Sequence, residues 1–164
     1  MGGNLGSVRA TLDRAVAAFC DGGEVRLLAR SSDYRTPPWG VSDQPAFVNL
    51  CLVVATDLGP HVLLDRARRI ETAFGRNRAQ EQRWGPRTLD IDVITVSGER
   101  SDDPELILPH PRAHERAFVL APWHDIDPLA ELPGRGPVAD LLAGVDAAGI
   151  RRGGAALVIP WTES

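Results

Sequence analysis

RWGPRTLDIDVI, residues 83–94, sets two aspartates into an otherwise apolar run. Aspartate is disfavoured in strands, and a bare carboxylate in a buried sheet is costly. Side chains two residues apart on a strand point to the same face, so Asp90 and Asp92 aim at one place while Leu89 and its apolar neighbours face the core. We therefore expect a strand over 88–97 whose first half carries a pair of carboxylates.

The carboxylate pair indicates a magnesium site. Mg²⁺ prefers oxygen ligands, and two convergent carboxylates can hold one or two such ions. Without a cation, like charges this close raise the pKa of one carboxyl group. The alternative for an isolated Asp-x-Asp is a surface salt-bridge network with nearby arginines, and the spacing of Arg83, Trp84 and Arg87 before the pair argues against it. Asp90 and Asp92 are therefore our candidate Mg²⁺ ligands.

The basic residues have an unusual composition. The chain contains no lysine, and all 18 basic residues are arginine. A Walker-A loop needs lysine, so P-loop nucleotide chemistry is excluded and any bound phosphate has to be neutralised by arginine. Several arginines precede the aspartates within a short segment: Arg66, Arg68, Arg69, Arg76, Arg78, Arg83 and Arg87. An exposed helix face is the favoured interpretation for Arg66 and Arg69, whereas the loop arginines beside a Mg²⁺ site indicate a bound polyphosphate.

Length and composition are those of a single globular domain. The chain has 164 residues, 43% of them hydrophobic and 24% charged, so we expect one domain over 1–164. The net charge of −4 gives no support to nucleic-acid binding. No apolar run approaches a membrane span and no leader pattern is present, which predicts a cytoplasmic protein without a membrane partner. Cys20 and Cys51 are expected to be free thiols.

Periodicity and turn signals predict an α+β fold. Ser7 can cap a first helix that ends near Asp21, and Pro60 opens a second helix that stops at Gly75. The other predicted elements are strands over 25–34, 46–56 and 88–97, helices over 113–121 and 137–145, and a short strand over 155–160. Two helices on one face of an antiparallel sheet give a sandwich. Because the chain begins directly on GGNLGS, we expect the first strand of such a pattern to be missing.

The pattern of motifs resembles the 6-hydroxymethyl-7,8-dihydropterin pyrophosphokinase family of folate biosynthesis. The motifs cover nearly the whole chain in order: GGNLGS at 2–7, YRTPPWG and QPAFVN within 34–49, GRNR and RWGPRTLDID within 75–92, and LPHPRAHERAFVLAP at 108–122. The resemblance implies a ferredoxin-like sandwich with long catalytic loops. It also implies transfer of pyrophosphate from ATP to the hydroxymethyl group of 6-hydroxymethyl-7,8-dihydropterin, which gives AMP and the pterin diphosphate.

The resemblance further implies a role for each matching residue. Asp90 and Asp92 would hold two Mg²⁺ ions, and the catalytic arginines that stabilise charge on the transferred group would be Arg76 and Arg87. The ATP-binding residues would be Glu71, Arg78, Trp84, His110 and Arg116. The pterin-binding residues would be Thr36, Pro38, Phe47, Asn49, Trp84 and Phe118. A flat heterocycle stacks well between aromatic faces, which agrees with this assignment of Phe47 and Phe118.

Two other functions remain open. Taken alone, His110 could be a turn histidine, and Phe47 and Phe118 could be ordinary core residues. The expected absence of the first strand makes a degenerate homologue, which binds ligands without turnover, one alternative. A ferredoxin-like sheet that stacks RNA bases on exposed aromatics is the other. The acidic balance argues against RNA, so we expect a monomer that acts on ATP and a reduced pterin without a nucleic-acid partner.

Overall fold

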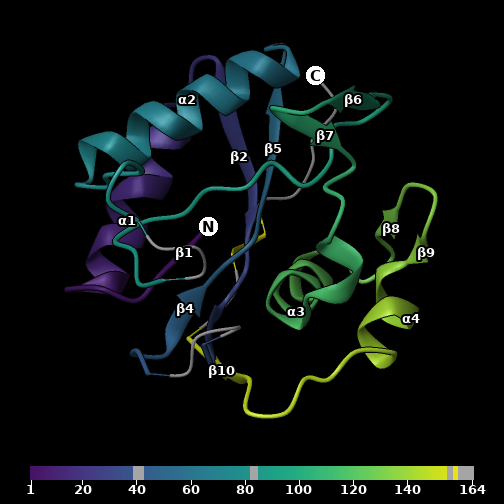
Figure 1. Cartoon of the computed structure of the whole chain (residues 1–164). Coiled ribbons are helices and arrows are strands. Elements are labelled where there is room, and N and C mark those ends of the chain that lie inside the picture. The colour runs from purple at the N-terminus through teal and green to yellow at the C-terminus, as the bar shows by residue number, and fades with distance from the viewer. Residues whose placement is uncertain (39–42, 82–84, 155–156, 159–164) are drawn as a thin grey trace.

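Helices lie on both sides of antiparallel β-structure (Figure 1). The computed structural model describes residues 1–38, 43–81 and 85–154 and the backbone of 157–158. This mixed architecture confirms the predicted α+β class. The elements, in order, are β1 (Gly2–Gly3), α1 (Val8–Phe19), β2 (Val25–Arg30), β3 (Asp33–Thr36), β4 (Phe47–Asn49), β5 (Leu52–Thr56), α2 (Pro60–Ala73), β6 (Ser101–Asp103), β7 (Leu106–Leu108), η1 (Ala113–Glu115), α3 (Ala117–Ile126), β8 (Glu131–Leu132), β9 (Gly136–Pro137), α4 (Val138–Ala143), β10 (Arg151–Gly153) and β11 (Leu157–Val158).

Helix α1 forms where the apolar spacing predicted a helix. Leu12, Val16 and Phe19 are buried at helical spacing and pack with α2 and the sheet in a first hydrophobic core. Ser7 occupies the N-cap position, but its side chain makes no capping hydrogen bond. The chain turns after the helix at Asp21, whose Oδ1 accepts the Gly23 amide at 3.1 Å. Both predicted ends of this helix are therefore confirmed.

Helix α2 begins at Pro60, which suits a first helical position, and ends in a Schellman motif. Gly75 adopts a φ of 88°, in the left-handed region that favours glycine. The Gly75 amide donates to the Thr72 carbonyl at 3.0 Å, and the Arg76 amide donates to the Glu71 carbonyl at 3.0 Å. The cap therefore carries Arg76 back over the end of the helix, next to Glu71.

Each of the strands predicted over 25–34 and 46–56 is divided in two. β2 pairs with β5 and β3 pairs with β4, both antiparallel. The division falls at Ser31, whose amide donates to the Cys51 carbonyl at 2.9 Å while the Cys51 amide donates to Ser31 Oγ at 2.9 Å. A side-chain oxygen thus replaces a ladder carbonyl, and the chain passes from the β11–β2–β5 sheet into the β1–β4–β3–β10 sheet.

A short strand stands where none was expected. β1 pairs with β4 through Gly2 and Gly3, and Gly2 also forms a bridge with Asp90. The expectation that the first strand is missing is therefore wrong for these two residues. A Cβ on Gly2 would lie 2.0 Å from Asn49 Oδ1, and a Cβ on Gly3 would lie 2.4 Å from the Thr88 carbonyl oxygen. Glycine is required for β1 to fit between its two neighbours.

The strand predicted over 88–97 is wrong. In the part of the chain that the structure describes, Asp90 is the one residue of this segment with a bridge partner, Gly2. β1 runs antiparallel to this segment and begins at Gly2, opposite Asp90. No strand among the described residues therefore pairs with the residues that follow Asp90. The predicted alternation still holds, since Ile91 is buried in the first core while Asp90 is half-buried and Asp92 is exposed.

Helix α3 covers the face of the β-structure opposite α1 and α2, and α4 packs against α3 (Figure 1). The helix predicted over 113–121 is the 3₁₀ turn η1 followed by α3, which continues to Ile126. α3 contacts β3 and β4, and Leu120 and Trp123 of α3 form a second core with Val138 of α4. α4 and β11 lie within the predicted ranges 137–145 and 155–160. No helix among the described residues is long and apolar enough to cross a membrane.

Candidate active site

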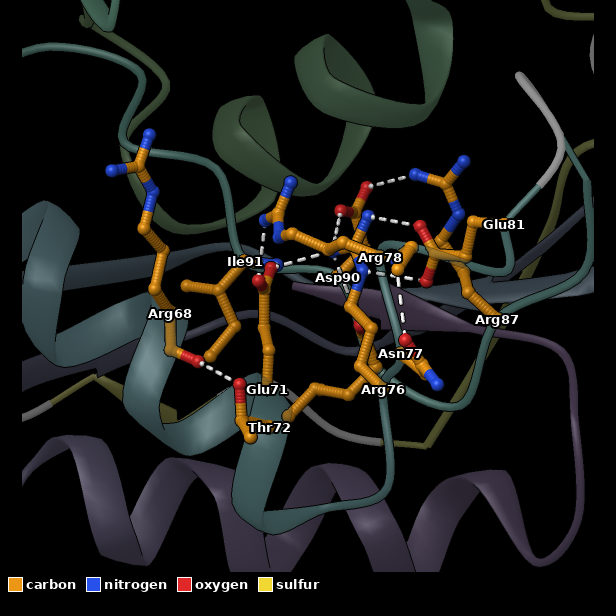
Figure 2. A network of polar contacts seen from close by, with 12 residues as sticks. Arg68, Glu71, Thr72, Arg76, Asn77, Arg78, Glu81, Arg87, Asp90 and Ile91 are labelled. Carbon is orange, nitrogen blue, oxygen red and sulfur yellow. Dashed lines mark hydrogen bonds and ion pairs between the residues drawn. The ribbon is translucent and has the colours of Figure 1, made fainter.

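Arg76 lies at the centre of a network of charged side chains (Figure 2). Its Nη1 donates to Glu71 Oε1 at 2.6 Å and to Asp90 Oδ1 at 2.5 Å. Its Nε and Nη2 donate to the two carboxylate oxygens of Glu81 at 2.8 and 3.0 Å. Only 4% of the Arg76 side chain is exposed. Because buried pairs are screened much less than surface pairs, these contacts hold the guanidinium firmly.

Glu71 ties the end of α2 to the segment that carries the aspartates. Its side chain is 1% exposed, and Oε1 accepts the Ile91 amide at 2.7 Å as well as Arg76. Its Oε2 accepts Arg78 Nη2 at 2.5 Å. A buried carboxylate is tolerated when its oxygens are paired and hydrogen-bonded in this way. Glu71 therefore fixes the backbone next to Asp90 at the helix end.

Asp90 contacts an arginine through each of its carboxylate oxygens. Oδ1 accepts Arg76, and Oδ2 lies 3.3 Å from Arg87 Nη1. Burial opposes ionisation of this group, but the charges of Arg76 and Arg87 outweigh burial and hold the pKa of Asp90 below its ordinary value. The carboxylate is therefore ionised at neutral pH and available to a cation that replaces either arginine.

Asp92 faces residues of the α3 region. Its Oδ2 lies 3.5 Å from Arg116 Nη1. The Arg116 guanidinium is also stacked 5.6 Å from the centre of the Phe118 ring. Both residues come from the start of α3, so this helix brings a predicted phosphate ligand and a predicted pterin wall beside the second aspartate.

His110 comes from the turn before η1. Its amide donates to the Ile94 carbonyl at 2.7 Å, and its Nδ1 accepts the Arg112 amide at 3.2 Å. Burial lowers the pKa of His110 below its ordinary value, although the negative charge of Asp92 opposes that shift. A neutral imidazole that accepts at Nδ1 carries its proton at Nε2, so His110 can donate a hydrogen bond to a phosphate oxygen.

A cavity of about 710 Å³ opens beside the aspartates, between β5, residues 90–100 and α3. Small-molecule sites have volumes of roughly 300–1,000 Å³, so a bicyclic ligand fits a cavity of this size. Asn49, Asp90, Asp92 and Phe118 line it. The structure thus brings two predicted pterin-binding residues and both predicted metal ligands to one space.

The structure does not place the remaining predicted pterin-binding residues at the cavity. Thr36 and Phe47 are cross-strand neighbours in the β3–β4 pair, and Asn49 Nδ2 donates to Thr36 Oγ1 at 2.8 Å. Thr36 and Phe47 adjoin Asn49 but do not line the cavity, and neither does the half-buried Pro38. Trp84, predicted for both ligands, lies outside the described residues.

Comparison with known proteins identifies the family. The family model for 7,8-dihydro-6-hydroxymethylpterin-pyrophosphokinase, abbreviated HPPK, matches residues 1–128. The chain belongs to the HPPK family. The 2-amino-4-hydroxy-6-hydroxymethyldihydropteridine pyrophosphokinase of Methylorubrum extorquens is 45% identical over 152 residues, which are 93% of this chain and 94% of the relative. Proteins of the same name from Pseudomonas aeruginosa and Bacillus subtilis are each 41% identical, the first over 93% of both chains and the second over 77% of this chain and 74% of its own.

Two residues that contact the predicted catalytic arginines were not singled out from the sequence, Asn4 and Glu81. Asn4 Oδ1 accepts the Arg87 amide at 2.9 Å, and the Asn4 amide donates to the Arg87 carbonyl at 3.0 Å. Asn4 Nδ2 donates to Gln44 Oε1 and to the Pro45 carbonyl, both at 2.9 Å. Asn4 thereby joins the loop after β1 to Arg87, and its place in the GGNLGS motif was the available signal. The sequence pattern gave no indication of a role for Glu81, apart from its being an acidic residue in an arginine-rich segment.

The donor set fits Mg²⁺. The described residues contain no group of three or more His, Cys, Asp or Glu that could hold a metal ion. Mg²⁺ does not require such a group, because it keeps several waters and is commonly held by one or two carboxylates plus substrate phosphates. The side chains of Asp90 and Asp92 are 30% and 38% exposed and line the same cavity, so both can reach such an ion.

Proposed function

We propose that this chain transfers pyrophosphate from ATP to the hydroxymethyl oxygen of 6-hydroxymethyl-7,8-dihydropterin, with AMP and the pterin diphosphate as products. One observation carries the proposal beyond family membership: Asp90 and Asp92 line a single cavity with Asn49 and Phe118. Oxygen ligands for a metal thus adjoin a stacking and hydrogen-bonding wall for a heterocycle. A ferredoxin-like arrangement of a single domain over 1–164 is part of the proposal.

Asp90 and Asp92 would hold two Mg²⁺ ions. When bound, the metal supplies charge neutralisation for the ATP phosphates. Arg76 and Arg87 contact Asp90, so they lie within one side-chain movement of a phosphate that a metal at that carboxylate would hold. Because phosphoryl-type transfer depends on positioning and charge stabilisation, these arginines need no covalent chemistry to act as catalytic residues.

Unpaired donors near Arg87 support phosphate binding there. Arg87 Nε and Thr88 Oγ1 are buried and make no hydrogen bond within the described part of the chain. Arg76, Arg87 and Thr88 also line a second, smaller cavity of about 400 Å³. Buried donors are normally paired, so an anionic oxygen is the chemistry that this wall accommodates.

The other nucleotide contacts follow from the same network. Arg78 Nη2 donates to Glu71 Oε2, and the rest of the side chain is exposed. Its other N–H donors can therefore contact phosphate. His110 would donate from Nε2, and Arg116 would exchange its contact with Asp92 for the nucleotide. Trp84 is assigned to ATP and pterin through its motif.

The pterin would stack on Phe118 and hydrogen-bond to Asn49. The bond from Asn49 to Thr36 fixes the orientation of the amide group. Phe47 and Pro38 complete the wall as motif-based assignments, with Phe47 on the same strand face as Asn49. A planar heterocycle gains from aromatic contact on its face, which matches these residue types.

Formation of AMP tests the function. The purified chain is incubated with ATP, Mg²⁺ and the reduced pterin alcohol, and the nucleotides are separated. AMP that depends on both Mg²⁺ and pterin is expected. ADP as the product, or AMP without pterin, contradicts the proposal. Binding of both ligands without AMP indicates the degenerate homologue, and a salt-sensitive complex with single-stranded RNA that exceeds ATP binding indicates the RNA-binding module.

We also propose that the protein acts as a cytoplasmic monomer without nucleic-acid partners. The net charge of −4 supports the last point. Light scattering after size-exclusion chromatography tests the oligomeric state, with a mass near 17.7 kDa expected. A concentration-independent dimer mass would contradict the monomer.

A further inference from the structure

Glu81 and Asp90 bind different nitrogens of the Arg76 guanidinium (Figure 2). It accepts Nε at 2.8 Å and Nη2 at 3.0 Å, which is the two-point geometry of a guanidinium–carboxylate pair. Nη1, the remaining nitrogen, makes every contact with the site: Glu71, the Leu89 carbonyl and Asp90. Glu81 therefore binds the Nε–Nη2 edge of the guanidinium, and Nη1 points toward the candidate site.

The three carboxylates around Arg76 are not equivalent. Glu71 also accepts hydrogen bonds from the Ile91 amide and from Arg78, so Arg76 is only one of its three partners. Asp90 would exchange arginine for metal in the proposed reaction. Glu81 makes no other hydrogen bond or ion pair that involves a described residue. Its carboxylate is thus dedicated to Arg76, and it can keep its two bonds while Asp90 releases Nη1.

We propose that Glu81 is a positioning residue for pyrophosphoryl transfer, which holds Arg76 by its Nε–Nη2 edge so that Nη1 faces the metal and phosphate site. This proposal rests on the proposed function for the reaction in which Arg76 acts. When metal binds Asp90, Nη1 loses one partner, and the Glu81 pair keeps the guanidinium from turning away. Without Glu81, Arg76 would depend on Asp90, Glu71 and the Leu89 carbonyl, and would compete more strongly with the metal.

The test compares Glu81→Ala, the isosteric Glu81→Gln, and Glu105→Gln as a matched control. Glu105 is exposed and pairs with Arg68 at 3.3 Å, and none of its contacts with described residues involves Arg76, Asp90 or Asp92. We expect Glu81→Ala to lower kcat about 10- to 100-fold, because small misplacements of a catalytic group cost up to about 100-fold. Glu81→Gln should fall between, since an amide has one acceptor oxygen. KM for ATP at saturating Mg²⁺ should change less than about threefold.

A second readout does not need turnover. The Mg²⁺ concentration that gives half-maximal binding of a non-hydrolysable ATP analogue should rise about three- to tenfold in Glu81→Ala, because Arg76 then holds Asp90 more tightly. A purely structural role would lower the melting temperature without this shift. Circular dichroism melting identifies a variant that fails to fold, and Glu81→Gln then carries the comparison.

A double-mutant cycle with Arg76→Ala gives the sharpest result. If Glu81 acts through Arg76, Glu81→Ala should change kcat less than about twofold in the Arg76→Ala background. An equal loss in both backgrounds overturns the proposal, as does a Glu81→Ala protein that matches Glu105→Gln in kcat and Mg²⁺ dependence. Absence of AMP formation by the unaltered chain instead refutes the proposed function, and the Mg²⁺-dependent binding shift still tests the role of Glu81.

Discussion

Asp90 is held by one arginine from a helix cap and another from the loop just before it, Arg76 and Arg87. Alternation along 88–92 predicted that the two aspartates share a side, and burial of Ile91 between them confirms that spacing. The salt-bridge network with arginines, which is the alternative that the sequence leaves for this pair, is present, although sequence spacing did not identify Arg76 as a partner. The carboxylate thus has two kinds of counter-ion, arginine here and Mg²⁺ in the proposed reaction, and the two compete for the same oxygens.

Replacement of Asp92 tests whether this single residue is a Mg²⁺ ligand. Asp92→Ala removes one of two proposed ligands, and we expect kcat to fall at least about 100-fold, since metal charge stabilisation supplies several kcal/mol. Stability should change by less than about 1 kcal/mol, because its ion pair with Arg116 is partly exposed. Steady-state AMP formation and thermal melting measure the two effects.

Asp102→Ala is the control for this prediction, since Asp102 is exposed on β6. It should leave both turnover and melting unchanged. Near-native turnover by Asp92→Ala would remove Asp92 from the metal site.

The lowered pKa of Asp90 predicts a pH-dependent contribution to stability. Burial opposes ionisation, but Arg76 and Arg87 bring the pKa below the ordinary 3.8. Such a group stabilises the fold above its unfolded pKa, and the contribution is lost as the pH falls through the folded pKa. The difference in free energy of unfolding between the unaltered chain and Asp90→Asn should therefore be largest near neutral pH and shrink below about pH 4.

Urea unfolding of both proteins in the presence of a chelator, at several pH values, measures this difference. A constant difference from neutral pH to pH 2 would mean that the arginines do not favour the ionised form.

The ends of the helices were predictable, whereas the limits of the strands were not. α2 carries its own boundaries, Pro60 at the start and Gly75 just beyond the end, and its apolar spacing needs no distant partner. Strand limits depend on neighbours. The Ser31 side chain interrupts a ladder that its apolar flanks predict, and the segment after Asp90 lacks a strand to pair with. Pattern alone cannot show either effect, because both arise from contacts between distant segments.

Replacement of Glu71 tests how α2 is joined to the 89–91 segment, and its expected effect is a loss of stability. Glu71→Ala removes the acceptor of the Ile91 amide and leaves Arg76 and Arg78 with one carboxylate fewer. Breaking a buried pair by removing one partner costs about 3–5 kcal/mol, and we expect a loss of that size. Glu71→Gln keeps the volume and one acceptor oxygen, so its loss should be smaller.

Urea denaturation provides the two free energies of unfolding. Glu99→Ala, a change at an exposed position, is the control and should be neutral. Equal and small losses for both Glu71 variants would show that the junction does not depend on this carboxylate.

For the molecule as a whole, the larger cavity lies between the edge of a sheet and a segment that forms no strand. β5 is the last strand of its sheet, residues 91–97 have no ladder partner among the described residues, and both line the same space. Gly2 bridges β4 and Asp90 at one end of that space, which makes the gap about two strand spacings wide, roughly 10 Å. The cavity therefore continues the line of β1.

The absence of lysine has a practical outcome at the edge of this cavity. With every basic side chain an arginine, no side chain of this sequence carries a primary amine. Glu99 is exposed and lines the cavity together with Asn49 and Asp90. In Glu99→Lys the new lysine would be the one amine-bearing side chain, so an amine-reactive fluorophore attached to it would report ligand binding beside the proposed pterin wall.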